Sequence, residues 1–260
     1  MAWLDQKRID SAARSLGTLG EIDFPLGSAT TYRVGGPAAI CVKAETEQDL
    51  LKVVNVGKIF DLAILVFGRG SNLLISDQGF EGIVVILSES FGEITINGHE
   101  VSAGGAVPLP VLARKTVSEK LSGLEWMVGV PGSVGGAIRM NAGGHGSDTS
   151  RSLVAAQIMD MRTGTVHQRT AQQLNFSYRS SNVKQSEIVL SARFKCDSDL
   201  RGDGQTLLSE IVRWRRENQP GGQNAGSVFV NPENGTSGSL IEEAGLKGLR
   251  MGSAFVSPRH

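Results

Sequence analysis

Short runs of apolar residues recur along the whole chain, and each run ends at Gly, Asn, Ser or a charged residue. Runs of this length, rich in Val and Ile, are typical of β-strands bounded by turns. The strands predicted in this way lie at 38–44, 62–68, 82–87, 94–98, 100–105, 153–161 and 186–194.

Helical patterns are interleaved with the predicted strands. The stretch 46–58 opens on Thr46, a favoured N-cap residue, and the stretch 110–123 begins with Pro and ends with Gly, as helices prefer. A third helix is predicted over 204–218, with an apolar side made of Leu207, Leu208, Ile211, Val212 and Trp214. Residues 220–236 are predicted to be loops, and 237–248 to contain a short helix closed by Gly245 or Gly248. The pattern indicates an α+β body followed by a smaller C-terminal lobe.

Composition narrows the class of protein. With 260 residues, 40% of them hydrophobic, the chain can bury one large core or two modest ones. Lys plus Arg and Asp plus Glu number 26 each, which argues against a general nucleic-acid binder. The N-terminus has no continuous apolar stretch, and the run at 83–87 is too short to span a membrane, so a cytoplasmic protein is expected. Neither the two cysteines nor the four histidines have the spacing of a metal site.

Glycine is the compositional outlier, and its 33 residues cluster at 68–82, 98–105, 123–146 and 221–252. In the first cluster a hydrophobic strand runs into Gly68 and Gly70, where backbone amides can approach a ligand closely, and Ser71 and Asn72 add side-chain donors. The spacing fits neither a Walker A loop nor a Rossmann turn. A phosphate cradle and an ordinary turn are both compatible with this segment.

The segment 123–144 has glycines too dense for the interior of a helix or strand, yet enough apolar residues to be partly buried. A buried backbone must find hydrogen-bond partners. A long polar cofactor lying along the loop would supply them, and so would the loop's own turns together with water.

Three motifs taken together resemble the UDP-N-acetylenolpyruvoylglucosamine reductase family: TYRVGGPA at 31–38, GRGSNLL at 68–74 and GVPGSVGGAIRMNAG at 129–143. The resemblance runs from about Phe24 to the last residue. It implies an α+β fold, namely an FAD-binding domain of the PCMH (vanillyl-alcohol-oxidase-like) type with two subdomains around the flavin, followed by a smaller, incomplete α+β substrate-binding lobe. The domains expected are an N-terminal helical segment at 1–23, the FAD-binding domain at 24–198 and the lobe at 199–260.

The resemblance also implies which residues bind non-covalent FAD. Those expected to hold the diphosphate are Gly68, Arg69, Gly70, Ser71 and Asn72, and those expected to lie along it are Gly129, Pro131, Gly132, Ser133, Gly135 and Gly136. Arg33 and Asn141 belong to the matched motifs, where direct contact with the cofactor and support of the loop both stay open. The cofactor loops contain no histidine or cysteine that signals a covalent flavin link.

The catalytic candidates come from two further motifs. In LNFSYRSS at 174–181, Arg179 taken alone reads as a solvated surface residue. The resemblance instead implies that Arg179 faces the substrate carboxylate, for which a guanidinium fork is well suited, with Tyr178 beside it. In GSVFVNP at 226–232 no G-x-S-x-G elbow surrounds Ser227, which argues against a hydrolase nucleophile. The family pattern implies that Ser227 donates a proton and that Asn231 is an amide on the substrate side.

The implied reaction is the NADPH-dependent, FAD-mediated reduction of UDP-N-acetylglucosamine enolpyruvate to UDP-N-acetylmuramate, in peptidoglycan precursor synthesis. The expected partners are NADPH and UDP-N-acetylglucosamine enolpyruvate. No metal, nucleic acid, membrane or obligate protein partner is expected. A related FAD oxidase is disfavoured, because the Tyr-Arg-x-Ser and Gly-Ser-x-Phe-x-Asn-Pro patterns belong to the reductases.

Two departures from the family pattern qualify this expectation. The family commonly has a lysine shortly before Pro220, where this chain has RRENQ, so Arg215 or Arg216 becomes the candidate cation for substrate or NADPH phosphate. No position matches the family's C-terminal catalytic glutamate, and a shortened enzyme is therefore expected. The alternative is a protein that binds FAD or a UDP-sugar without full turnover.

Overall fold

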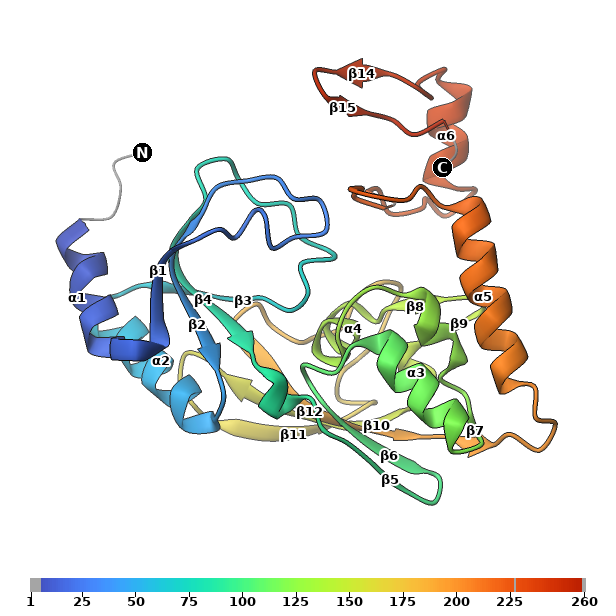
Figure 1. Cartoon of the computed structure of the whole chain (residues 1–260), viewed down its shortest axis with the longest axis horizontal. Coiled ribbons are helices and arrows are strands. Elements are labelled where there is room, and N and C mark those ends of the chain that lie inside the picture. The colour runs from blue at the N-terminus through green and yellow to red at the C-terminus, as the bar shows by residue number, and fades with distance from the viewer. Residues whose placement is uncertain (1–5, 227, 259–260) are drawn as a thin grey trace.

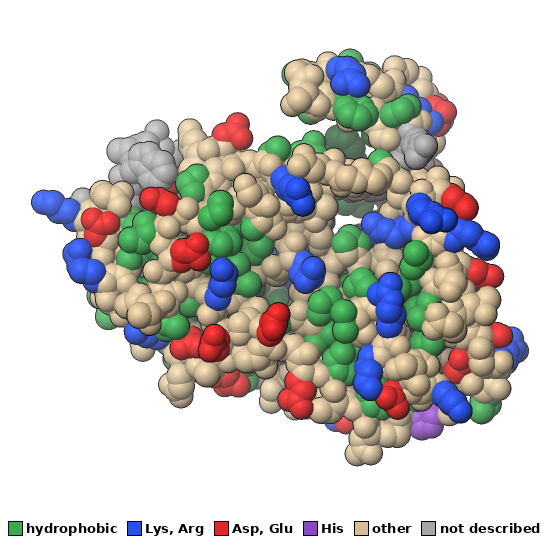
Figure 2. Space-filling model, viewed as in Figure 1, with side chains coloured by type: hydrophobic (Ala, Val, Ile, Leu, Met, Phe, Trp, Pro, Cys, Tyr) green, Lys and Arg blue, Asp and Glu red, His purple; other side chains and the backbone are tan. Residues whose placement is uncertain are grey.

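The computed structural model describes residues 6–226 and 228–258, which form a two-sheet body and a smaller C-terminal lobe (Figure 1). Helix α5 (Gly204–Asn218) lies against the body and leads into the lobe, which stands over it. In Figure 2 the surface is hollowed between the lobe and the body.

The first sheet has the strand order β1 (Gly20–Phe24), β2 (Ala38–Ala44), β4 (Phe80–Leu87) and β3 (Ala63–Val66). Only the β1–β2 pair is antiparallel. Because successive side chains alternate between the two faces of a strand, Ile40 and Val42 pack under helices α1 (Gln6–Leu16) and α2 (Glu47–Ile59), whereas Cys41 packs on the opposite face.

The second sheet is antiparallel throughout, in the order β11 (Val166–Thr170), β10 (Leu153–Asp160), β12 (Glu187–Lys195), β6 (Glu100–Gly104) and β5 (Ile94–Asn97). The core on its inner face includes side chains of α3 (Leu109–Ser118), α4 (Val134–Met140) and the 3-10 helix η3 (Glu125–Gly129). Strand β12 joins the two halves of the body, because Val189 belongs to this core and Ile188 and Leu190 to the core under α1 and α2.

The remaining elements are short. In the body they are η1 (Gly17–Leu19), η2 (Glu89–Phe91), β7 (Leu121–Ser122), β8 (Gly143–Gly144), β9 (Ser147–Asp148), η4 (Thr149–Arg151) and β13 (Asp197–Ser198). In the lobe they are α6 (Ser237–Glu243), β14 (Arg250–Met251) and β15 (Ala254–Phe255).

All seven predicted strands are present, and the helices expected at 46–58, at 204–218 and within 237–248 form as α2, α5 and α6. Three local predictions are wrong. Residues 20–23, expected in an N-terminal helical segment, belong to strand β1. The helix expected to reach Gly123 ends at Ser118, because the backbone turns at Lys120, with φ of +57°, into β7. Residues 134–140, judged too glycine-rich for a regular element, form α4.

The apolar side predicted for α5 is broader than the surface it buries. Leu208 and Ile211 belong to the body's core, whereas Leu207, Val212 and Trp214 are 41%, 44% and 47% exposed. Helix α5, which was predicted to belong to the C-terminal lobe, therefore anchors that lobe to the body.

Among the described residues, every helix is too short or too polar to span a membrane.

Candidate functional site

Three loops that are distant in sequence meet where β3 ends. The amide of Thr31 donates to the carbonyl of Gly70 at 3.1 Å, and the Ser71 hydroxyl donates to the carbonyl of Pro131, also at 3.1 Å. Phe67, only 4% exposed, anchors the middle loop at the end of β3. The three motifs singled out in the sequence therefore build one surface.

The glycines of this surface meet two different requirements. Gly70 has φ of +63°, and a Cβ placed on it would lie 2.7 Å from both Phe67 and the backbone of Thr30, so the turn itself needs glycine. A Cβ on Gly135 would lie 3.2 Å from the carbonyl oxygen of Gly105, against which α4 packs. Both residues serve the fold.

Gly68, Gly132 and Gly136 differ from these, because their missing Cβ atoms would meet only side chains, although the φ of Gly132, +142°, by itself also favours glycine. The nearest atoms would be the hydroxyl oxygens of Ser133, Ser71 and Ser133, at 3.1, 3.4 and 3.8 Å respectively. Glycines whose missing side chains leave serine hydroxyls as the nearest groups form a cradle in which a polar ligand can approach the backbone closely. These residues fit the diphosphate of a dinucleotide, and we call Gly68, Ser71, Gly132, Ser133 and Gly136 the glycine cradle.

Three of the four longer side chains proposed for the cofactor lie exposed around these loops: Arg33, Arg69 and Asn72. Arg33 has φ of +55°, and its amide donates to the hydroxyl of the buried Thr30 at 2.9 Å. Thr30 was not recognised from the sequence. Its Oγ1, which also donates to Gly27, holds the turn on which Arg33 projects.

Asn141 supports a loop through its side chain. It ends α4 with φ of +40°, and its amide nitrogen donates to the carbonyl of Ser177 at 2.9 Å. Its amide oxygen accepts from the amide of Ser150 at 3.1 Å. Because both ends of the side chain bind backbone groups and the residue is only 4% exposed, the structure favours loop support over direct cofactor contact.

The Ser177 that Asn141 holds begins the tight turn that carries Tyr178 and Arg179. Ser177 and Ser180 exchange backbone hydrogen bonds of 3.0 and 3.2 Å, which close the turn. Arg179 has φ of +55°, a conformation that costs a non-glycine residue about 1 kcal/mol or more. The guanidinium lies 5.0 Å from the centre of the Tyr178 ring, and its Nη2 donates to the carbonyl of Gly143 at 2.9 Å.

The C-terminal lobe reaches the same turn. The amide nitrogen of Asn231 donates to the Tyr178 hydroxyl at 3.4 Å, and its amide oxygen accepts from the amide of Ser237, the first residue of α6. The structure therefore brings Tyr178, Arg179 and Asn231 together. The predicted proton donor, Ser227, lies outside the described residues.

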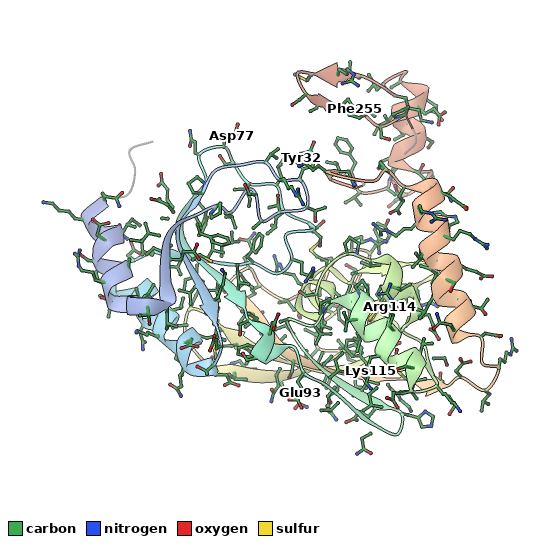
Figure 3. All side chains as sticks on the ribbon, in the orientation of Figure 1. Tyr32, Asp77, Glu93, Arg114, Lys115 and Phe255 are labelled. Atoms are coloured by element: carbon green, nitrogen blue, oxygen red, sulfur yellow. The ribbon has the colours of Figure 1, made fainter. Side chains whose placement is uncertain are left out.

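The two candidate arginines before Pro220 have different surroundings. Arg215 donates through Nη1 to the carbonyl of Gly129, and burial lowers the pKa of its guanidinium. Arg216 is exposed and, with Arg114 and Arg213, lines a hollow of about 390 Å³ between α3 and α5. Figure 3 labels Arg114 on α3, and Figure 2 shows Lys and Arg side chains gathered on this side of the body. Of the two, Arg216 is free to meet a phosphate.

The carbonyl of Gly143 and the side chain of His145 were not predicted as part of the site. Both lie in the β8–β9 hairpin, which begins at the last residue of the matched motif, and the positive φ of His145, +51°, marks its turn. The glycine pair Gly143–Gly144 was the available signal. A Cβ on Gly143 would lie 2.6 Å from the carbonyl oxygen of Ser147 across the hairpin and 3.0 Å from Nη1 of Arg179, so the hairpin itself requires glycine and the guanidinium lies close against it.

Thiol and metal chemistry find no support among the described residues. Burial, with smaller contributions from nearby carboxylates, raises the pKa of Cys41 and of Cys196 to about 11, which leaves both thiols protonated and unreactive at neutral pH. No group of three or more metal-binding side chains occurs in the described part of the chain. The chemistry that the described residues can offer is a polar cradle and an exposed guanidinium beside a tyrosine.

Comparisons with known proteins agree with this arrangement. A family profile described as "FAD binding domain" matches residues 38–169, and one described as "UDP-N-acetylenolpyruvoylglucosamine reductase, C-terminal domain" matches residues 218–260. The chain is 40% identical over 242 residues to UDP-N-acetylenolpyruvoylglucosamine reductase 1 of Bacillus anthracis, an alignment that spans 92% of this chain and 80% of that protein.

Solved structures show the same relationship at the level of the fold. The crystal structure of UDP-N-acetylenolpyruvylglucosamine reductase (MurB) from Thermus caldophilus superposes with a TM-score of 0.82 at 34% identity, covering 93% of this chain and 85% of that one. A glucose dehydrogenase, wild-type Phl p 4.0202, has a TM-score of 0.55 at 13% identity over 74% of this chain and 44% of its own, which shows a shared fold alone.

Proposed function

Because the chain belongs to the UDP-N-acetylenolpyruvoylglucosamine reductase family, the flavin oxidoreductases of peptidoglycan synthesis, we propose that it reduces UDP-N-acetylglucosamine enolpyruvate to UDP-N-acetylmuramate with NADPH. Bound FAD would accept a hydride from NADPH and supply it to the terminal vinyl carbon of the substrate. Orientation, charge stabilisation and proton delivery would be left to the protein.

The observation that carries the proposal is the position of α4 between the two halves of the site. Ser133 of the glycine cradle precedes this helix, and Asn141, which holds the Arg179 turn, ends it. Seven helical residues span about 10 Å, so one rigid element sets the spacing between cradle and guanidinium. We propose that the cradle binds the FAD diphosphate and that Arg179 faces the substrate carboxylate.

The chemistry requires a cation at that point. Hydride addition to the vinyl carbon leaves an enolate-like charge beside the carboxylate, and a guanidinium held in advance stabilises it without having to reorganise. The hydrogen bond from Nη2 to Gly143 fixes one edge of the Arg179 fork, leaving the side chain exposed for a carboxylate. We propose that Ser227 then protonates the adjacent carbon, with Asn231 and Tyr178 on the substrate side and Arg216 near a phosphate.

The test separates the two halves of the reaction. The FAD-loaded chain is reduced anaerobically with NADPH and then mixed with UDP-N-acetylglucosamine enolpyruvate while flavin absorbance is followed. We expect both reduction and reoxidation. Flavin that is reduced but not reoxidised by the substrate would refute the proposed turnover and leave a protein that binds FAD or a UDP-sugar.

Arg179→Ala gives the residue-level prediction. We expect a fall of roughly a hundredfold to a thousandfold in the rate of reoxidation by substrate, with flavin reduction nearly unchanged, because only the second half develops charge beside the carboxylate. Arg193→Ala is the matched control, since Arg193 lies on the second sheet and pairs with Glu100 at 3.2 Å. If the flavin of Arg179→Ala is reoxidised by the substrate at the parental rate, the role proposed for Arg179 is wrong.

A further inference from the structure

Arg215 extends from α5 to the last residue of η3, immediately before the loop that contributes to the glycine cradle. Its guanidinium donates to the carbonyl of Gly129, which is buried. Arginine stays protonated at physiological pH, so this is a charge-assisted hydrogen bond formed partly away from water, where such bonds are strong.

Gly129 allows α5 to come close to η3. A Cβ on this glycine would lie 2.8 Å from Cγ2 of Ile211 and 3.0 Å from Nε2 of His145. The first distance is shorter than real Cβ contacts and the second is tighter than most, so a larger residue would require the side chain of Ile211 or of His145 to move. Gly129 is therefore a point where three elements touch.

The third element, the β8–β9 hairpin, contacts α5 directly. The rings of His145 and Trp214 meet edge to face, with centres 5.2 Å apart and an angle of 87°. The same hairpin supplies the Gly143 carbonyl that binds Arg179. A contact therefore runs from α5 through the hairpin to the guanidinium proposed to face the substrate.

The chain that leaves α5 enters the C-terminal lobe within one helical turn of Arg215, at Gln219 and Pro220. There Asn231 binds the hydroxyl of Tyr178, which is next to Arg179. Helix α5 thus contacts the segment that leads to the cradle and the hairpin that holds Arg179, and it carries the lobe.

We propose, on the basis of the function proposed above, that Arg215 is a positioning residue. Its hydrogen bond to Gly129 holds the glycine cradle, the β8–β9 hairpin and the C-terminal lobe in the relative positions that substrate reduction requires. Misplacing reacting groups by about 1 Å can cost on the order of a hundredfold in rate. Arg215 acts through Gly129 and α5 and does not contact the substrate.

Arg215→Met tests the proposal, since methionine keeps much of the apolar contact and removes the donors. Arg213→Met is the control, because Arg213 lies on the same helix, is exposed and lines the hollow next to α3. In the FAD-free chain we expect Arg215→Met to speed hydrogen–deuterium exchange at 129–136 and 143–148, and Arg213→Met to leave both segments unchanged. Equal exchange in the two variants would overturn the proposal, whatever the chain's activity.

The FAD-loaded variants provide the kinetic readout. We expect Arg215→Met to lower the rate of flavin reoxidation at saturating substrate by roughly tenfold to a hundredfold, with a smaller change in KM and in flavin reduction by NADPH. Arg215→Lys, which keeps one charged donor, should recover part of the rate. Parallel losses in both half-reactions that follow the loss of folded protein would show a purely structural role and overturn the proposal.

A second variant reaches the same contact from the other side. Gly129→Ala crowds the side chain of Ile211 on α5 and leaves Arg215 itself unchanged. We expect it to lower reoxidation in the same way, and adding Ile211→Ala should restore part of it. No restoration would count against the contact at Gly129. Should the parental chain fail to reduce the substrate, the proposed function fails on its own, and the exchange experiment still decides whether Arg215 links these segments.

Discussion

Gly70 and Gly136 show how one residue type meets two different physical demands at the same site. Gly70 adopts a positive φ in a crowded turn, whereas Gly136 lies in α4 with only the Ser133 hydroxyl near the place of its missing Cβ, at 3.8 Å. Glycine at position 70 is therefore needed for the turn to fold. Glycine at position 136 instead leaves room for a ligand to approach the backbone.

Alanine substitutions should separate these two roles. We expect Gly70→Ala to destabilise the protein by about 1 to 3 kcal/mol, because the new Cβ meets Phe67 and Thr30 and the φ is unfavourable. We expect Gly136→Ala to leave stability unchanged or slightly raised, since alanine favours helix, while FAD affinity falls at least tenfold. Urea unfolding of the FAD-free chains and flavin titration measure the two effects, and a Gly136→Ala chain that binds FAD normally would remove Gly136 from the cradle.

Much of the candidate site could be predicted from individual residues, but its connections could not. The cradle glycines, Tyr178, Arg179 and Asn231 were marked by their motifs. The bond between Ser71 and Pro131 joins residues 60 positions apart, and the bond between Arg179 and Gly143 joins residues 36 apart. Tertiary contacts of this kind have no local sequence signal. The supporting role of Asn141 likewise became visible only when both ends of its side chain had partners.

Among the elements, the predicted strands were the more reliable, because buried apolar runs bounded by turn residues leave a direct mark on the sequence. Strand β11 was missed because its sequence, VHQRT, is mostly polar and exposed at the edge of its sheet. Helix α4 was missed because Gly135 and Gly136 have low helix propensity. Close approach to Gly105 and the cradle require glycine there, and tertiary contacts override the propensity.

An ion pair that reaches across β10, from β11 to β12, leads to a prediction about pH. Arg169 of β11 forms a two-pronged ion pair with Glu187 of β12, whose side chain is 2% exposed. Burial alone would raise the pKa of Glu187, but hydrogen bonds from Arg169 and from the amide of Lys184, with the charges of both residues, together lower it. A lowered pKa in the folded state stabilises the protein above the usual glutamate pKa, and this stabilisation is lost as pH falls through the lowered value.

Arg169→Gln should therefore destabilise the protein by about 3 kcal/mol at neutral pH, because it leaves a buried carboxylate without its cation. The difference should shrink as pH falls through the acidic range, where Glu187 can take up a proton. Urea unfolding at several pH values measures this. Arg193→Gln, whose exposed partner is Glu100, should change the free energy of unfolding by less than about 1 kcal/mol at any pH. A constant deficit for Arg169→Gln across the range would contradict the linkage.

At the scale of the whole molecule, the body and the lobe contribute unequally to the hydrophobic cores. Among the described residues, Ile211 is the last member of any of the three hydrophobic clusters, so the lobe contributes nothing to those cores. Its larger apolar side chains, such as Phe229, Met251 and Phe255, are more than half exposed. Figure 3 shows Phe255 in the lobe and Tyr32 on a loop of the body, at the two sides of the hollow between them. Stability therefore belongs to the body, and the lobe depends on α5 and on the Tyr178–Asn231 contact for its position.

This inequality predicts the effect of removing the lobe. A chain ending at Gln219 keeps α5, the Arg215–Gly129 bond and every described member of the cores. We expect it to unfold cooperatively, with a thermal midpoint within a few degrees of the parental value, and to bind FAD with similar affinity, since the cradle lies wholly in the body. Flavin reduction by NADPH should persist to some extent, whereas reoxidation by UDP-N-acetylglucosamine enolpyruvate should disappear, because Ser227 and Asn231 are gone. Calorimetry, flavin titration and single-turnover absorbance measure these properties on one preparation.

A large drop in the thermal midpoint or in FAD affinity would mean that the lobe helps to hold the body together. Flavin reoxidation at the parental rate would mean that substrate reduction needs none of the lobe's residues.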